Sequence, residues 1–216
     1  MNDESNGDWL TLGRRLAALA QSGLTFTKDP YDAQRYQELR KIAARIISRG
    51  SHIEAATVHE ALAMETGYAT PKIDVRAVVF RPEHDALLMV KEKLDGDRWT
   101  LPGGWADVGD SPSSAAEREV LEETGYQVKA RQILAVLDRE APRHAHPPIL
   151  HHVWKIFVGC SLEGGETVDS IETSGAAFMS LEQIESCSLS TSRVTISQIR
   201  YLFASRGTPN VPVTFD

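Results

Sequence analysis

Three glutamates lie close together in the segment from Gly104 to Tyr126, at Glu119, Glu122 and Glu123. If this segment is helical, a rotation of about 100° per residue places all three carboxylates within an arc of roughly 100°. The three negative charges then share one helix face near the C-terminal end, where the helix dipole is negative as well. Such a face attracts a divalent cation, and a plain solvated charged face is the alternative interpretation.

Local signals predict where this helix begins and ends. Ser111 is a favourable N-cap, Pro112 suits the first helical position, and Gly125 can adopt the left-handed conformation that ends a helix. A glycine- and proline-containing loop therefore leads into a short helix with its acids in the last turns.

The spacing of these residues resembles the Nudix box. The matching positions are Gly104, Asp110 and the run from Arg118 through Glu119 and Glu122-Glu123 to Tyr126. Two positions depart from the family pattern, because Asp110 stands where Glu is usual and Tyr126 stands where an aliphatic residue is usual. The shorter acid alters a position that helps to hold the loop against the helix.

The resemblance extends over nearly the whole chain. Residues 24–32, 67–76, 99–107 and 189–195 are similar to a bacterial Nudix subgroup with an N-terminal helical extension. Members of this subgroup are labelled ADP-ribose pyrophosphatases, and some are similar to CDP-choline pyrophosphatase, which releases CMP and phosphocholine. The resemblance implies a nucleoside diphosphate derivative as the substrate.

Hydrolysis of a diphosphate linkage needs positive charge on the phosphate oxygens and an activated water. We interpret Glu119, Glu122 and Glu123 as ligands of Mg²⁺, with Mn²⁺ as a substitute, because Mg²⁺ prefers oxygen ligands. By resemblance, the backbone carbonyl of Gly104 is a further ligand. Arg118 either orients the acids and pairs with Asp110, or is an ordinary exposed helical arginine.

The general base is Glu119 in the first interpretation. The alternative is an acid on a later segment, where the candidates are Glu163, Glu166 and Glu172. Each of these three could equally be a solvent-exposed loop residue.

A second set of residues is predicted to contact the substrate. Arginine binds phosphate and aromatic rings stack on nucleobases, although each tryptophan also reads as ordinary core. Two histidines lie in a proline-rich segment that resembles a substrate loop. The candidates are Arg76, Arg98, Trp99, Trp105, His144 and His146. His151 and His152 are adjacent and cannot share one face of a strand, so zinc is not expected.

The composition narrows the function classes. A formal net charge of −7 argues against a broad nucleic-acid surface. The only cysteines, Cys160 and Cys187, are too few for a disulfide framework, which is typical of a reducing cytosol. The N-terminus lacks an apolar signal segment and no run of 18 apolar residues occurs, so we expect a cytoplasmic protein without a membrane span.

Hydrophobic periodicity predicts two regions. Helices are expected over residues 8–21, ended by Gly23, over 30–50, and from a capping box over residues 51–54 to about residue 65. They form an N-terminal helical arm, residues 1–68, which is too small for a core of its own and is predicted to make a homodimer.

Residues 69–216 form the second predicted domain. Strands are expected at 73–80, 86–90, 128–137, 149–158 and 176–179, and helices at 181–185 and 191–204. The fold class is α/β (α+β), and by resemblance a Nudix-type α/β/α sandwich with a mixed sheet.

The leading functional interpretation is a Mg²⁺-dependent hydrolase that splits a nucleoside diphosphate derivative such as ADP-ribose or CDP-choline. RNA-end processing or exonuclease activity is the second interpretation, and the acidic composition counts against it. A ligand-sensing Nudix module without turnover is the third, and the intact set of glutamates counts against that one.

Overall fold

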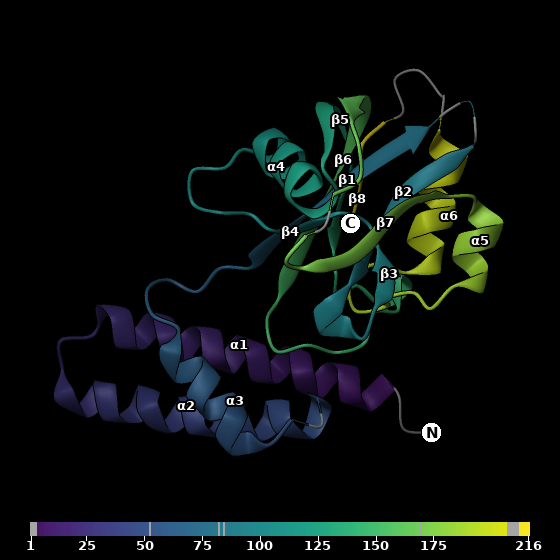
Figure 1. The fold of residues 1–216 in the computed structure, drawn as a ribbon. Helices are drawn as coiled ribbons and strands as arrows, with labels where there is room; N and C mark the ends of the chain where they lie inside the picture. The colour runs from purple at the N-terminus through teal and green to yellow at the C-terminus, as the bar shows by residue number, and fades with distance from the viewer. Residues whose placement is uncertain (1–3, 52, 82, 84, 169, 207–211) are drawn as a thin grey trace. The chain divides into compact units, whose positions relative to one another are not determined.

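The computed structural model describes residues 4–51, 53–81, 83, 85–168, 170–206 and 212–216 (Figure 1). Its contacts divide the chain into two compact units. One unit comprises residues 1–71 with 148–152, and the other comprises residues 72–147 with 153–216.

The first unit is built from three helices, α1 (Glu4–Phe26), α2 (Pro30–Ser51) and α3 (Ala55–Met64). Helix α2 begins as predicted, because the Asp29 carboxylate accepts hydrogen bonds from the backbone N–H groups of Tyr31 and Asp32, at 2.7 and 3.1 Å. A core of small and aliphatic side chains joins the helices: Leu10, Ala17, Ala43, Ala44, Ile47 and Val58.

Two predicted helix boundaries in this unit were wrong. Helix α1 continues through Gly23, where a Cβ would lie 2.4 Å from the Tyr36 ring, so this glycine permits close packing and does not stop the helix. Ser51 belongs to the end of α2, and its hydroxyl donates to the Ile47 carbonyl at 2.8 Å. The N-cap of α3 is Glu54, which forms no side-chain capping bond.

The second unit contains a mixed sheet, with eight strands among the described residues. The strands are β1 (Lys72–Arg81), β2 (Ala86–Glu92), β3 (Arg98–Thr100), β4 (Gly103–Trp105), β5 (Tyr126–Asp138), β6 (Val153–Gly165), β7 (Thr173–Met179) and β8 (Thr214–Phe215). The order is β3-β2-β1-β6-β5-β8, with β4 on β1 and β7 on β2. The pairs β1–β6 and β5–β8 are parallel, and the other pairs are antiparallel.

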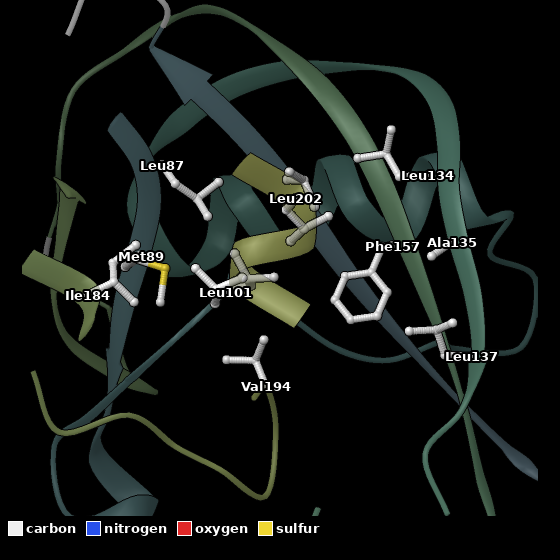
Figure 2. Close-up of a cluster of buried hydrophobic side chains, with 12 residues drawn as sticks. Leu87, Met89, Leu101, Leu134, Ala135, Leu137, Phe157, Ile184, Val194 and Leu202 are labelled. Carbon is white, nitrogen blue, oxygen red and sulfur yellow. The ribbon is translucent and has the colours of Figure 1, made fainter. Parts of the chain in front are cut away.

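Helices cover both faces of this sheet, which confirms the predicted α/β/α sandwich. Helix α4 (Pro112–Thr124) packs Ala115, Ala116 and Val120 against the buried side chains of one face. Helices α5 (Leu181–Ser186) and α6 (Ile196–Ser205) cover the other face, where Leu202 meets Phe157 in a second apolar cluster (Figure 2). Figure 1 shows α4 on one side of the strands and α5 and α6 on the other.

The structure also revises two elements of this unit. Residues 149–152, predicted to open a strand, are irregular and belong to the helical unit, where the Arg14 side chain donates to the carbonyls of Ile149 and Leu150. Helix α6 begins at Ile196, because Thr195 is its N-cap. No helix in the described part of the chain is both long enough and apolar enough to cross a membrane.

Candidate functional site

Helix α4 carries the three glutamates and is capped at both ends as predicted. The Ser111 side chain accepts from the Ser114 backbone N–H, and Ser114 returns the bond to complete a capping box, with Pro112 at the first helical position. Gly125 ends the helix with a φ of 77°, a left-handed conformation that suits glycine. These caps fix where the helix turns lie, and therefore which residues face the sheet.

The three glutamates, here called the α4 acids, differ in environment. Glu119 is 8% exposed and Glu123 is 3% exposed, whereas the side chain of Glu122 is 58% exposed. Two carboxylates thus face the interior beside the sheet, and one faces solvent on the same side of the helix.

Arg118 forms ion pairs with two of the α4 acids and with Asp110. Its guanidinium lies 3.1 Å from an Asp110 carboxylate oxygen, 3.0 Å from Glu119 and 2.9 Å from Glu122. The ion pairs tie the preceding loop to the helix and offset part of the repulsion between like charges one turn apart. These contacts raise the pKa of Arg118, although burial opposes them.

Strand β4, where the sequence predicted a glycine loop, approaches the acids through backbone atoms. Gly103 has a φ of 138°, and a Cβ there would lie 2.1 Å from the Val75 carbonyl oxygen, so only glycine fits. The Gly103 N–H donates to the Glu123 carboxylate at 2.9 Å. A Cβ on Gly104 would lie 3.1 Å from the Glu119 carboxylate, so the absence of a side chain leaves the main chain open to the acids.

Burial makes the inner acids hard to ionise. It raises the pKa of Glu123 to about 8, against the opposing effects of the Arg76 charge and the Gly103 N–H. The pKa of Glu119 is raised for the same main reason, against the charges of Arg118 and Arg76. The nearby positive charges do not fully offset the burial of these two carboxylates, so a further cation bound here would stabilise their ionised form.

The donor set fits a divalent cation, because carboxylate and carbonyl oxygens are the ligands that such ions prefer. No group of three or more His, Cys, Asp or Glu side chains among the described residues already converges as a metal site. Arg118 bonds to Glu119 and Glu122 at the same time. Gathering these acids on one cation therefore requires that the Arg118 ion pairs loosen.

The other predicted substrate residues lie in different surroundings. Trp105 follows Gly104 on β4 and is 53% exposed, but it pairs with Asp74 of β1, so its side chain lies on the sheet face opposite the α4 acids. Arg76 is only 5% exposed. Arg98 forms an ion pair with Asp95 at 3.6 Å, and Trp99 packs against the core of the α6 face.

The two histidines lie by the α6 side and are not gathered with the α4 acids. His144 is 8% exposed, bonds to the Asp216 carboxylate at 3.0 Å, and lines an apolar cavity of about 210 Å³ under α6. His146 bonds to the Thr191 carbonyl at 2.7 Å and to Gln198 at 3.1 Å. Burial lowers the pKa of His146 to about 4, so its imidazole is neutral at pH 7.

The candidates for an alternative base are exposed. Glu163 forms an ion pair with Arg131 at 3.0 Å, with both side chains at least half exposed. Glu172 directly precedes Thr173, whose hydroxyl donates to the Glu123 backbone carbonyl at 2.7 Å. Glu172 thus lies at the end of the strand that meets α4, while Glu163 is occupied elsewhere.

Sequence reasoning missed three buried charged residues near the site: Asp74 on β1, Glu92 on β2 and Lys155 on β6. The burial of Asp74 could have been predicted, because Asp74 and Arg76 alternate with Val75 within an otherwise apolar strand. The burial of Glu92 and Lys155 follows from tertiary packing and left no local signal.

Comparisons with known proteins identify the family of the chain. Residues 70–198 match the NUDIX domain family, and residues 7–62 match a family described as "UDP-X-like, N-terminal oligomerisation domain". The Bacillus subtilis (strain 168) protein YjhB, provisionally named an ADP-ribose pyrophosphatase, is 40% identical over 208 residues, which cover 96% of this chain and 97% of that protein.

Two solved structures are also similar. A crystal structure of UDP-X diphosphatase is 31% identical, covers 98% of this chain and 99% of its own, and has a TM-score of 0.60. A crystal structure of an ADP-ribose pyrophosphatase from Streptococcus suis 89-1591 is 34% identical, covers 68% of this chain and all of its own, and has a TM-score of 0.59. With its capped acidic helix, its glycine loop and these matches, the chain belongs to the Nudix family of hydrolases.

Proposed function

We propose that this Nudix hydrolase cleaves the diphosphate linkage of a nucleoside diphosphate derivative, with Mg²⁺ as its metal and Mn²⁺ as a substitute. The products are a nucleoside monophosphate and a phosphorylated moiety. The names of the relatives support this substrate class, since they refer to ADP-ribose and to UDP-X. CDP-choline remains a further candidate of the same class.

The burial of Glu119 and Glu123 is the observation that carries the proposal. Both carboxylates lie against the Gly103–Gly104 backbone with raised pKa values, a costly arrangement that a cation offsets. Nudix hydrolases generally use divalent metal ions. The bound ion supplies positive charge to the phosphate oxygens and lowers the pKa of water.

Each residue then has a defined role. Glu119, Glu122 and Glu123, together with the Gly104 carbonyl, hold the metal. Glu119 is the proposed general base, and Glu172 is the alternative, because it precedes Thr173, which bonds to the Glu123 backbone. Arg118 bridges Glu119 and Glu122 through its Nη1 atom in the metal-free protein, so these ion pairs compete with a cation for the two carboxylates.

Trp105 is the proposed stacking surface for a nucleobase. Its ring is 53% exposed on β4, one residue after Gly104, and aromatic stacking on a base contributes about 1–3 kcal/mol. Trp105→Leu should therefore raise the KM for substrate more than it lowers kcat.

A substrate panel tests the proposal. The protein is incubated with Mg²⁺ and ADP-ribose, CDP-choline, a UDP-linked sugar or a 5′-phosphorylated RNA, and the products are separated by anion-exchange chromatography. Formation of a nucleoside monophosphate from one of the diphosphate derivatives supports the proposal. Hydrolysis of the RNA alone would replace it with RNA-end processing.

The helical arm is proposed to form a homodimer through α1. Large apolar side chains recur along one side of this helix at the a and d positions of a heptad repeat: Trp9, Leu12, Leu16, Leu19 and Phe26. Four of them are 45–67% exposed, whereas Leu16 packs against the core that joins α1 to α2 through Leu10 and Ala17. Exposed apolar surface of this extent is typical of an interface.

Charged substitutions on the apolar side of α1 test the proposed dimer. Leu12→Lys with Leu19→Lys should give a monomer by light scattering, because each interface would then bury unpaired charges. Leu12→Lys alone is compared with Thr11→Lys as its matched control, since each adds one positive charge on the same helix and Thr11 lies outside the apolar side. A dimer that survives the double change rules out this surface.

A further inference from the structure

Three charged side chains lie buried together on the sheet face opposite α4. Asp74 and Arg76 are two residues apart on β1, so they point to the same side, and Lys155 on β6 is the register partner of Asp74. Asp74 and Arg76 are each 5% exposed and Lys155 is fully buried. We call these three residues the buried ion cluster.

Every charged group in the cluster has a defined partner. Arg76 Nε donates to one Asp74 carboxylate oxygen at 2.8 Å, and Lys155 Nζ donates to the other. Arg76 Nη1 donates to the Leu101 backbone carbonyl at 3.1 Å. Burial lowers the pKa of Lys155 to about 8, against the favourable charge of Asp74, so this lysine is mostly charged at pH 7. One carboxylate and two cations leave a net charge of +1.

The cluster is linked to the α4 acids by the chain from Leu101 to Gly103. Arg76 fixes the Leu101 carbonyl, the Ala77 N–H donates to the Pro102 carbonyl at 2.9 Å, and the Gly103 N–H donates to Glu123. The positive charge of Arg76 also acts on both inner acids, lowering the pKa of Glu119 and of Glu123.

A substrate-binding role for Arg76 fits this geometry poorly. Its Nε and Nη1 groups are committed to Asp74 and Leu101, and it is almost inaccessible to solvent. Burying three ionised side chains costs several kcal/mol per ion before pairing, and apolar side chains of similar volume are often as stable. Stability alone therefore gives no reason for three charged side chains at these positions.

We propose that Asp74 and Lys155 are positioning residues that fix Arg76, and that Arg76 in turn holds the Leu101–Gly104 segment and the inner α4 acids in place for metal binding. Arg76 thereby acts on the reaction through Glu119 and Glu123 and does not bind substrate. This inference rests on the proposed role of Glu119 and Glu123 as metal ligands.

The variant Asp74→Asn with Lys155→Met gives the sharpest test. It leaves Arg76 as the only charge in the cluster, so the net charge of +1 is unchanged while the carboxylate that fixes Arg76 is lost. Asp74→Asn alone would leave two buried cations without a carboxylate, which is expected to unfold the protein. Thermal unfolding first confirms that the double variant is folded.

Two readouts then separate the possible roles of Arg76. Isothermal titration of Mn²⁺ into the metal-free protein should show binding weakened by about tenfold or more, as for other residues that support metal ligands. Turnover with Mg²⁺ should show kcat lowered by about tenfold or more, while the substrate KM changes by less than about threefold. A raised KM with unchanged Mn²⁺ binding and kcat would show that Arg76 binds substrate.

Unchanged Mn²⁺ affinity, kcat and KM would show that the cluster serves only the structure and would overturn the inference. If the double variant does not fold, Arg76→Lys replaces it, because lysine keeps the charge but lacks the planar fork that reaches Asp74 and Leu101 together. The same loss of Mn²⁺ affinity is expected, and wild-type affinity in this variant would overturn the inference.

Controls separate this inference from the proposed function. Glu185→Gln with Arg200→Met removes an ion pair of 2.7 Å between α5 and α6, and should leave Mn²⁺ binding and turnover unchanged. Glu119→Gln with Glu123→Gln should abolish Mn²⁺ binding at the site. If it does not, the proposed metal ligands are wrong, whatever the cluster variants show.

Discussion

Replacing Glu123 by Gln is expected to stabilise the metal-free protein while it removes a proposed metal ligand. Glu123 is 3% exposed, and burial raises its pKa from 4.5 to about 8. A glutamine side chain has nearly the same shape and keeps an oxygen that accepts the Gly103 N–H. It has no proton to gain or lose in this pH range, so its burial does not incur the cost of protonating a carboxylate on folding.

The magnitude follows from proton linkage. Between pH 4.5 and pH 8 the folded protein keeps the Glu123 proton while the unfolded chain loses it, so wild-type stability falls as the pH rises through this window. Each pKa unit corresponds to about 1.36 kcal/mol, and 7 − 4.5 units therefore give about 3 kcal/mol at pH 7.

Urea unfolding in the presence of a chelator measures this difference. The free energy of unfolding of Glu123→Gln should exceed that of the wild type by about 1 kcal/mol at pH 5 and about 4 kcal/mol at pH 8. Glu122→Gln is the control, because it makes the same substitution one residue away on a side chain that is 58% exposed and therefore not buried. Equal stabilities of the wild type and Glu123→Gln at pH 8 would refute the argument from burial.

Three further predictions concern the same loop and helix. Glu119→Gln should lower kcat by about 100-fold or more while the far-ultraviolet circular dichroism is unchanged, and near wild-type turnover at saturating Mg²⁺ would remove Glu119 from the site. Asp110→Glu should keep kcat/KM within about threefold, because the Arg118 guanidinium 3.1 Å away can follow a carboxylate one methylene longer; a large loss would show that the loop has repacked around the shorter acid. Gly103→Ala should lower the free energy of unfolding by about 2 kcal/mol or more, since its Cβ would meet the Val75 carbonyl, whereas Gly96→Ala, which meets no atom within 4 Å, measures the cost of the positive φ alone. Equal losses for the two alanine variants would contradict the packing at Gly103.

Local chemistry was sufficient to predict α4. The N-cap at Ser111, the proline that follows it and the C-terminal Gly125 act within a few residues of one another, so their effect can be read without the fold. The same holds for the common face of the α4 acids, because helix geometry alone sets their spacing. Strands β1 and β5 were likewise predicted, because each contains a run of apolar residues with β propensity.

Long-range packing decided what the sequence could not show. Lys155 becomes buried because the parallel register of β1 and β6 places it opposite Asp74, a pair 81 residues apart. Arg76 was predicted to bind phosphate from its residue type, and only the fold shows that its guanidinium is committed internally. Gly23 was interpreted as a helix stop, although the nearby Tyr36 ring explains it as a close contact.

The most direct test of the proposed function is product analysis of the wild type beside the variant Glu119→Gln with Glu123→Gln. Each protein is incubated with ADP-ribose, CDP-choline or a UDP-linked sugar, with Mg²⁺ or with a chelator. We predict that the wild type with Mg²⁺ releases a nucleoside monophosphate from at least one substrate, and that the chelator or the double substitution abolishes this release. Turnover that persists in the double variant, or that does not require a divalent cation, would contradict the account.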